Sequence, residues 1–253
     1  AYIEQGYNII FGTTFGYIDA MAEMAEEYPD VIFLHCSGYL SNDSNFGNYF
    51  GKMYQPRYLA GLQAGEMTTS NKIGYVAAFP IPEVIRGINA FAAGVKEVNP
   101  EATVEVVWTF TWFGPEEETQ AANALIETGV DVLAQHQDSP STGLVAEANG
   151  AKWISYNTNY GQSAAPEAYT GAPVWDWGPY YVSVVNSIID GEFAGGAYWG
   201  GMETGLVSYD TIFDQGPMAD LINDVQAQII SGEFDPEIVE DKFIDNVIGT
   251  VNP

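Results

Sequence analysis

Positively charged residues are scarce in this sequence. Its 253 residues include 7 Lys and Arg against 34 Asp and Glu, which gives a formal net charge of −27 at pH 7. Such a surface repels phosphate backbones and anionic lipid headgroups, which argues against nucleic-acid binding and against direct insertion into a membrane. The acidic residues are spread along the chain. We interpret them either as a source of solubility or as an adaptation to high salt, where screening relieves their mutual repulsion.

Cysteine and histidine are nearly absent. Cys36 is the single cysteine, so no intramolecular disulfide can form, and the redox compartment cannot be inferred from cysteine usage. The two histidines, His35 and His136, have no cysteine or histidine ligand near them in the sequence. A zinc site is therefore not expected, because such sites need three or four Cys, His or carboxylate ligands. We expect neither a metal nor a cofactor.

Several signatures of other protein classes are also missing. No stretch approaches the roughly 18 apolar residues of a membrane-spanning helix, and the opening residues do not resemble a signal peptide. The sequence contains no phosphate-binding P-loop, no serine nucleophile elbow and no glycine-rich dinucleotide motif after a strand. His136 and Asp138 could form an acid–base pair, although such a pair more often only closes a strand end. We therefore expect a protein that is not an enzyme.

What the sequence does contain is an alternation of apolar, β-branched runs with segments of helical periodicity. This order is typical of an α/β protein whose parallel sheets are covered by helices on both faces. The polar segment 68–72 interrupts the pattern, and we interpret it as a crossing between two lobes. Strands are expected at residues 7–12, 31–35, 73–78, 104–110, 131–135 and 152–156. Helices are expected near residues 19–28, 82–99, 115–128, 179–192 and 217–234.

Aromatic and uncharged polar residues recur where the expected strands end. Open α/β sheets bind ligands at the carboxyl ends of their strands. This composition suits a flat, mostly neutral ligand held between rings and oriented by a few hydrogen bonds. Any one aromatic residue could simply fill the edge of a lobe, but five strand ends together favour a site. The candidate ligand-binding residues are Phe15, Tyr17, Phe79, Glu83, Trp112, Phe113, His136, Asp138, Asn159, Trp175, Asp176, Trp177 and Trp199.

Glu83 and Arg86 are three residues apart on the expected helix 82–99. They could form a surface ion pair, as residues at this spacing often do. Alternatively, Arg86 lies near the mouth of a ligand cleft and bridges two lobes.

Long stretches of the chain resemble the BMP (basic membrane protein) family, the substrate-binding proteins of ABC importers, in the subgroup associated with purine nucleosides or nucleobases. The resemblance implies a type I periplasmic-binding-protein fold, with two Rossmann-like lobes that have parallel sheets and close on a ligand. The implied lobes are residues 1–70 plus 174–197 and residues 71–173 plus 198–253, with hinges near 68–72, 172–175 and 196–200. The stretches are "FGTTFGYIDA", "YFGKMYQPRYLAG", "NKIGYVAAFPIPEVIRGINAFAAGVKEVNP", "TWFGPEEETQAANALIETGVDVLAQHQDSP" and "APVWDWGPYY" with "YWGGM".

The same resemblance implies a function and a location. The protein would capture an adenine-like purine nucleoside or nucleobase and present it to an ABC permease. It would work outside the cytoplasm, in a periplasm or as a lipoprotein anchored at the cell surface. Two other functions stay open: a ligand-sensing receptor domain on the same fold, or a nucleoside hydrolase, for which no cluster of acidic residues is evident.

The sequence departs from the family pattern in two places. Family members usually begin with a further β-α-β-α unit of about 70 residues, which is consistent with ordinary βαβ sizes. This unit and the export signal are expected to be absent here, which would leave the N-terminal lobe incomplete and dependent on another segment. Second, Asn159 stands where the family often carries an aspartate that binds ribose hydroxyls. We expect this exchange to weaken the preference for nucleosides over free bases.

Overall fold

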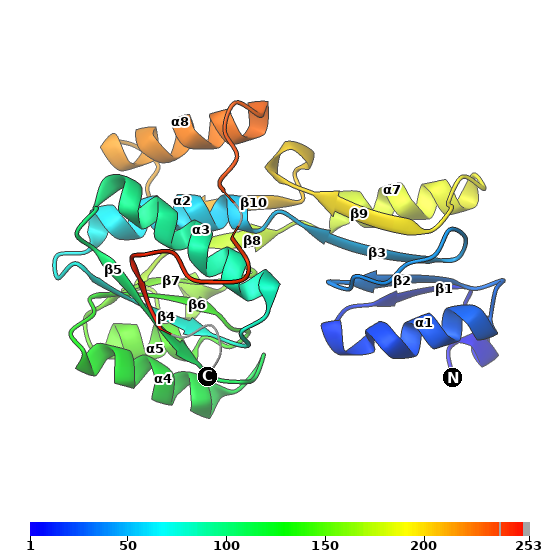
Figure 1. The fold of residues 1–253 in the computed structure, drawn as a ribbon, viewed down its shortest axis with the longest axis horizontal. Helices are drawn as coiled ribbons and strands as arrows, with labels where there is room; N and C mark the ends of the chain where they lie inside the picture. The colour runs from blue at the N-terminus through cyan, green and yellow to red at the C-terminus, as the bar shows by residue number, and fades with distance from the viewer. Residues whose placement is uncertain (238, 250–253) are drawn as a thin grey trace. The chain divides into compact units, whose positions relative to one another are not determined.

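The computed structural model describes residues 1–237 and 239–249 of the chain. Residue contacts divide it into two compact units, which Figure 1 shows as ribbons. The first unit contains Ala1–Lys52 and Asp176–Leu206, and the second contains Met53–Trp175 and the chain from Val207 onward. Both units are therefore discontinuous in sequence, and each is described separately.

The first unit is built on a four-stranded parallel sheet with strand order β1-β2-β3-β9. Helices α1 and α7 cover opposite faces of this sheet (Figure 1). A small core forms where α1 packs its buried Met21 and Ala25 against Phe33 and Phe46 of the sheet. The elements are η1 (Ile3–Gln5), β1 (Ile9–Gly12), η2 (Phe15–Tyr17), α1 (Ile18–Glu27), β2 (Ile32–Cys36), β3 (Phe46–Gly51), α7 (Gly178–Ile189), β9 (Gly196–Gly200) and η3 (Met202–Thr204).

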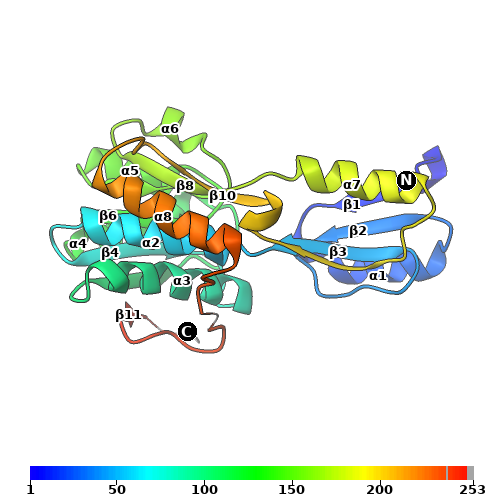
Figure 2. The same cartoon turned by 90° about the horizontal axis from the view of Figure 1, so that it is seen from above.

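The second unit is built on a seven-stranded sheet with strand order β10-β8-β7-β6-β4-β5-β11. All neighbouring strands are parallel except β10, which runs antiparallel to β8 at one edge. Helices α2, α3 and α8 lie on one face and α4 and α5 on the other (Figures 1 and 2). The elements are α2 (Tyr54–Met67), β4 (Lys72–Ala77), α3 (Pro82–Val98), β5 (Thr103–Trp108), α4 (Pro115–Glu127), β6 (Val132–His136), α5 (Ser141–Ala148), β7 (Lys152–Ile154), α6 (Gly161–Ala164), β8 (Tyr169–Trp175), β10 (Val207–Thr211), α8 (Pro217–Ser231) and β11 (Val247–Ile248).

Two glycines let α2 and α3 pack with their backbones in contact. A β-carbon on Gly61 would lie 1.9 Å from the carbonyl oxygen of Phe91, and one on Gly94 would lie 2.2 Å from the carbonyl oxygen of Tyr58. Side chains cannot be accommodated at such distances, so only glycine permits this approach. The close packing holds the N-terminal turns of both helices in place beside the carboxyl end of β4.

The six strands expected from the sequence are present, each with ends within two residues of the expected ones. The five expected helices are present as α1, α3, α4, α7 and α8. Several further elements, which carry no clear periodicity or are very short, were not expected from the sequence. These are α2, α5, α6, β3, β8, β9, β10 and β11.

The segment 68–72, expected to cross between lobes, joins α2 to β4 inside the second unit. The Asp131 carboxylate holds this turn by accepting four hydrogen bonds, from the Thr68 and Thr69 hydroxyls and from the backbone N–H groups of Thr69 and Ser70. The chain passes between the units after Lys52 and again at residues 175–176 and 206–207. The lobe boundaries expected near residues 70, 174 and 197 stay a prediction.

Candidate functional site

Aromatic rings from neighbouring strand ends meet at the carboxyl edge of the second sheet. Phe79 follows β4, Trp112 follows β5, and His136 ends β6. The ring centroids of Phe79 and Trp112 lie 5.2 Å apart, and those of Trp112 and His136 lie 6.0 Å apart. The backbone N–H of Asp138 donates to the carbonyl oxygen of Trp112 at 3.1 Å, which ties the two loops together. These four residues were expected at a ligand-binding site from the sequence, and they lie together in the structure.

Glu83 adds a carboxylate to this edge from the first turn of α3. Its Oε1 atom lies 3.6 Å from Nε2 of His136. The Glu83 side chain is partly exposed, whereas His136 is buried. Burial lowers the pKa of His136 because it disfavours the charged imidazolium; the Glu83 carboxylate opposes this shift and the positive charge of Arg57 reinforces it. The imidazole is therefore neutral near pH 7.

Asp138 pairs with an amide rather than with His136. The Asn157 side-chain N–H donates to Asp138 Oδ1 at 2.7 Å, and Asn157 has a left-handed backbone with φ of 68°. Protein around the Asp138 carboxyl reduces its hydration and raises its pKa, although the side chain is exposed and the bond from Asn157 opposes the shift. The acid–base pair of His136 and Asp138 considered from the sequence does not form directly, because each has another neighbour.

A fully buried arginine lies beneath these groups. Arg57 of α2 donates from Nη1 to the carbonyl oxygen of Gln135 at 2.7 Å, and its guanidinium carbon lies 4.0 Å from the centroid of the Tyr156 ring. The Tyr156 ring in turn lies 4.5 Å from the ring of His136. Arg57, Tyr156 and Asn157 were not predicted from the sequence. The one signal for Arg57 was a lone basic residue within an apolar, glycine-containing stretch.

The remaining candidates of the second unit lie around this edge. Phe113 is exposed, and Trp175 is half-buried at the end of β8. Asn159 is exposed, and it lines a recess of about 350 Å³ together with Asn157 and Trp175. Arg86, which was expected either to pair with Glu83 or to bridge two lobes, donates to Glu240 within the second unit.

The five candidates of the first unit lie in three places. Trp177 and Trp199 belong to an aromatic cluster, because both rings lie near Phe50, at centroid distances of 6.4 Å and 6.1 Å. Asp176 is exposed, and its Oδ1 accepts a hydrogen bond from the backbone N–H of Gly178. Phe15 and Tyr17 lie in η2, where Phe15 is half-buried and Tyr17 exposed. That these residues and those of the second unit hold one ligand stays a prediction.

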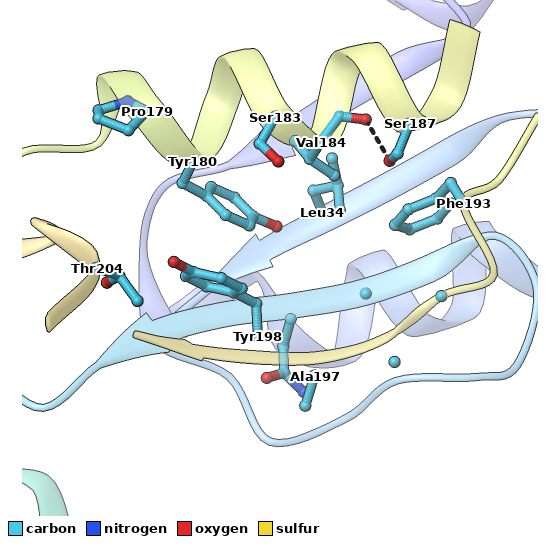
Figure 3. Close-up of a pocket in the computed structure, with 14 residues that line it drawn as sticks. Leu34, Pro179, Tyr180, Ser183, Val184, Ser187, Phe193, Ala197, Tyr198 and Thr204 are labelled. Carbon is cyan, nitrogen blue, oxygen red and sulfur yellow. Dashed lines mark hydrogen bonds between the residues drawn. The ribbon is translucent and has the colours of Figure 1, made fainter. Parts of the chain in front are cut away.

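The first unit also has a recess of about 470 Å³ beneath α7, which the sequence did not predict (Figure 3). The rings of Tyr180 and Tyr198 meet at one end of it, with centroids 4.6 Å apart, and Phe193 lies at the other end. Ser187 on α7 donates its hydroxyl to the carbonyl oxygen of Val184 at 2.8 Å.

The described residues contain no group of three or more His, Cys, Asp or Glu side chains placed to hold a metal ion. Within residues 1–237 and 239–249, no helix has the length and apolar character needed to cross a bilayer.

Comparison with known proteins places the chain in a family. Residues 2–234 match the profile of the Bmp family, described as ABC transporter substrate-binding proteins that are PnrA-like. The chain belongs to the Bmp family. A putative ABC transporter glucose-binding protein of Haloferax volcanii is 46% identical over 239 residues, which are 92% of this chain and 60% of that protein. A purine-binding protein of Brucella abortus is 37% identical over 91% of this chain and 66% of its own length. The chain thus spans roughly three fifths to two thirds of these two relatives.

Solved structures show the same fold at low sequence identity. A transcriptional activator of the comK gene from Bacillus halodurans has a TM-score of 0.81 at 21% identity, covering 93% of this chain and 82% of that one. A solute-binding protein from Aeropyrum pernix has a TM-score of 0.77 at 17% identity, covering 93% and 78%. These likenesses show the fold alone, and that fold is the type I periplasmic-binding-protein fold. The family and the fold class predicted from the sequence are confirmed.

Proposed function

We propose that this Bmp-family protein captures a purine nucleobase or nucleoside and presents it to the permease of an ABC importer. The observation that carries the proposal is the meeting of Phe79, Trp112 and His136 with two carboxylates at one sheet edge. The Brucella abortus relative, named a purine-binding protein, supports the same ligand class.

The chemistry of this edge suits a purine. Aromatic rings attract the flat face of a heterocycle, and such contacts contribute roughly 0.5–1.5 kcal/mol beyond the area they bury. A purine also presents ring nitrogens and, in adenine, an exocyclic amine at its rim. The Asp138 carboxylate can accept from an amine, and the partly exposed Glu83 carboxylate is a second acceptor. The Asn157 amide supplies both donor and acceptor groups.

A sugar is the second candidate ligand. The Haloferax volcanii relative is named a putative glucose-binding protein and has the higher identity of the two. The Asp138 carboxylate can accept hydrogen bonds from sugar hydroxyls, and the Asn157 amide can both accept from them and donate to them. An aromatic ring can cover the apolar face of a pyranose. The two candidates differ in whether binding needs a stacked heterocycle.

The family assignment also supports a role and a location. A substrate-binding protein of an ABC transporter holds its ligand without converting it, so we propose that the protein is not an enzyme. It would work outside the cytoplasm, in a periplasm or attached to the cell surface through a lipid anchor. Its acidic surface would stay soluble in concentrated salt.

Two measurements test the ligand. Mass spectrometry of small molecules released from the denatured protein should identify a purine. Calorimetric titration should then show saturable binding of adenine, adenosine, guanosine or inosine, and not of glucose. Trp112→Leu should weaken purine binding by about tenfold, the equivalent of 1.4 kcal/mol. Trp108→Leu is the matched control, because Trp108 stacks on Phe243 outside this cluster. Saturable glucose binding without purine binding would replace the purine proposal by the sugar one.

A further inference from the structure

Three buried nitrogen atoms beneath the site have no hydrogen-bond partner among the described residues. They are Nε and Nη2 of Arg57 and Nδ1 of His136. Both side chains are at least nine-tenths buried, with Arg57 0% and His136 3% exposed. A buried polar group without a partner is costly, so native proteins satisfy such groups with protein or with ordered water.

The chemistry of the three atoms is complementary. Nε2 of His136 faces the Glu83 carboxylate at 3.6 Å, and a carboxylate only accepts hydrogen bonds. In a neutral imidazole one nitrogen donates and the other accepts, so Nε2 carries the proton and Nδ1 must accept. Arg57 has only donors. His136 Nδ1 therefore lacks a donor, and the two Arg57 nitrogens lack an acceptor.

Two of these atoms, Arg57 Nε and His136 Nδ1, lie near Gly87 of α3. A β-carbon built on Gly87 would lie 3.8 Å from Arg57 Nε and 3.9 Å from His136 Nδ1, with no heavy atom closer. A methyl group therefore fits at this position, and a water that contacts both nitrogens would lie in front of the Gly87 α-carbon. A water there can accept a hydrogen bond from Arg57 Nε and donate one to His136 Nδ1, so that one molecule gives both nitrogens a partner.

We propose that Arg57 is a positioning residue for the ligand site. It donates to a buried water beside Gly87, the water donates to His136 Nδ1, and His136 holds its Nε2–H toward Glu83. Glu83 is thereby oriented at the sheet edge where the ligand binds. This proposal rests on the proposed function only for its last step, since the bridge exists in the protein without ligand.

The charged and titratable groups around His136 come from three parts of the chain. Glu83 and Arg86 lie on α3, Arg57 on α2, and Tyr156 after β7. Burial and the two arginines hold the pKa of His136 below its ordinary value, and Glu83 opposes them. The imidazole therefore stays neutral, and Glu83 at Nε2 and the bridge at Nδ1 together select its tautomer.

Two substitutions at Gly87 distinguish the loss of the hydrogen-bonded bridge from the steric effect of a larger side chain. Gly87→Ala places a methyl group in the space and leaves Arg57 Nε and His136 Nδ1 without a hydrogen-bond partner. Gly87→Ser places a hydroxyl there, which can accept from Arg57 and donate to His136 in place of the water. The β-carbon fits in both variants, because its nearest neighbouring atoms lie at ordinary contact distances. Gly87→Ala should weaken ligand binding by about tenfold, while Gly87→Ser should bind within about threefold of the unmutated protein.

Nitrogen NMR of protein labelled at histidine gives a readout that needs no ligand. The two histidines, His35 and His136, are told apart with a His35→Gln variant. His136 should show the neutral Nε2–H tautomer in the unmutated protein and in Gly87→Ser, and a changed tautomer ratio in Gly87→Ala. A charged imidazole or the Nδ1–H tautomer in the unmutated protein overturns the bridge.

The binding data decide the positioning role. Equal ligand affinities of Gly87→Ala and Gly87→Ser overturn that role even if the tautomer is as expected. If neither purines nor glucose bind the unmutated protein, the proposed function fails, and the tautomer readout alone still decides the bridge.

Discussion

The guanidinium carbon of Arg57 lies 4.0 Å from the centroid of the Tyr156 ring, and none of the ion pairs between described residues includes Arg57. The buried charge is instead stabilised by the negative face of the ring and by the carbonyl oxygen of Gln135. A planar guanidinium can stack on a ring and donate to a carbonyl at the same time, whereas a lysine ammonium is a compact point charge.

Arg57→Lys should therefore lower the free energy of unfolding by about 1–2 kcal/mol, the size of a desolvated cation–π contact. Urea denaturation measures this change. Arg86→Lys is the matched control, since Arg86 pairs with a partly exposed Glu240 and such a pair contributes less than about 1 kcal/mol. Equal losses in both variants would show that stacking on Tyr156 does not stabilise Arg57.

The contact between α2 and α3 gives a second prediction. Gly61→Ala or Gly94→Ala should lower the free energy of unfolding by about 3 kcal/mol or more, because each new methyl group would meet a backbone carbonyl. The gain of about 1 kcal/mol in helix propensity does not offset this loss. Glu66→Ala at the exposed C-terminal end of α2 is the control and should change stability by less than about 0.5 kcal/mol. If urea denaturation shows that the glycine variants lose no more stability than Glu66→Ala, the close approach of the α2 and α3 backbones is contradicted.

The buried carboxyl of Glu118 makes stability depend on pH. Glu118 is 0% exposed, and it accepts hydrogen bonds from the Ser139 hydroxyl and the Gly114 backbone N–H. Burial raises its pKa above the ordinary value of 4.5, and these bonds oppose the shift. The folded protein therefore binds this proton more tightly than the unfolded chain. Its contribution to stability is complete below the ordinary value and is lost as the pH rises through the raised one.

The free energy of unfolding of the unmutated protein, minus that of Glu118→Gln, should therefore be larger at about pH 4 than at about pH 7. Ser139→Ala should extend this pH dependence upward, because it removes a hydrogen bond that holds the pKa down. Denaturant titrations across this range measure both effects. A difference that stays constant with pH would mean that burial does not perturb Glu118.

The net charge of −27 gives a prediction about salt. Repulsion among the acidic residues opposes the compact state, and salt screens it as the Debye length falls from about 10 Å at 0.1 M to about 3 Å at 1 M. The melting temperature should therefore rise as KCl is increased from about 0.1 M to about 2 M. A flat or falling melting temperature over this range would leave solubility as the explanation of the acidic surface.

Asn159 offers a test of ligand choice. A carboxylate at this position could accept hydrogen bonds from both ribose hydroxyls, and bonds to a charged group contribute about 1.5–3 kcal/mol against about 1 for neutral ones. Asn159→Asp should therefore raise the affinity for adenosine relative to adenine by about threefold or more. Calorimetry with both ligands measures the ratio, with Asn149→Asp on the far end of α5 as the control. An unchanged ratio would show that Asn159 does not contact the sugar.

The sequence predicted best where a segment has one buried face. Helix α3 was expected from Pro82, and its apolar residues recur at helical spacing because one side packs on the sheet. Helix α2 was missed because residues 54–65 are buried on every side, which removes the amphipathic period. The short edge strands β10 and β11 were missed for a different reason, since their pairing partners are distant in sequence.

The candidate site was predicted in part for a similar reason. Phe79, Trp112, His136 and Asp138 follow strands, and parallel strands bring their carboxyl ends to one edge. Arg57 enters the site from the preceding helix, and its role depends on the packing of α2 on α3. Asn157 was missed although it lies two residues before Asn159, because a left-handed backbone conformation directs its side chain to Asp138.

Because both units are discontinuous in sequence, some strands must wait during translation for pairing partners that are synthesised much later. Residues 46–51 of β3 cannot pair with β9 until β9 has been synthesised, and the chain in between includes residues 53–175 of the second unit. That segment in turn leaves the edge of β8 unpaired until β10 emerges. During translation each unit therefore waits for later parts of the chain, and the nascent chain carries exposed strand edges, among them those of β3 and β8, which chaperones or premature contacts with other chains can reach.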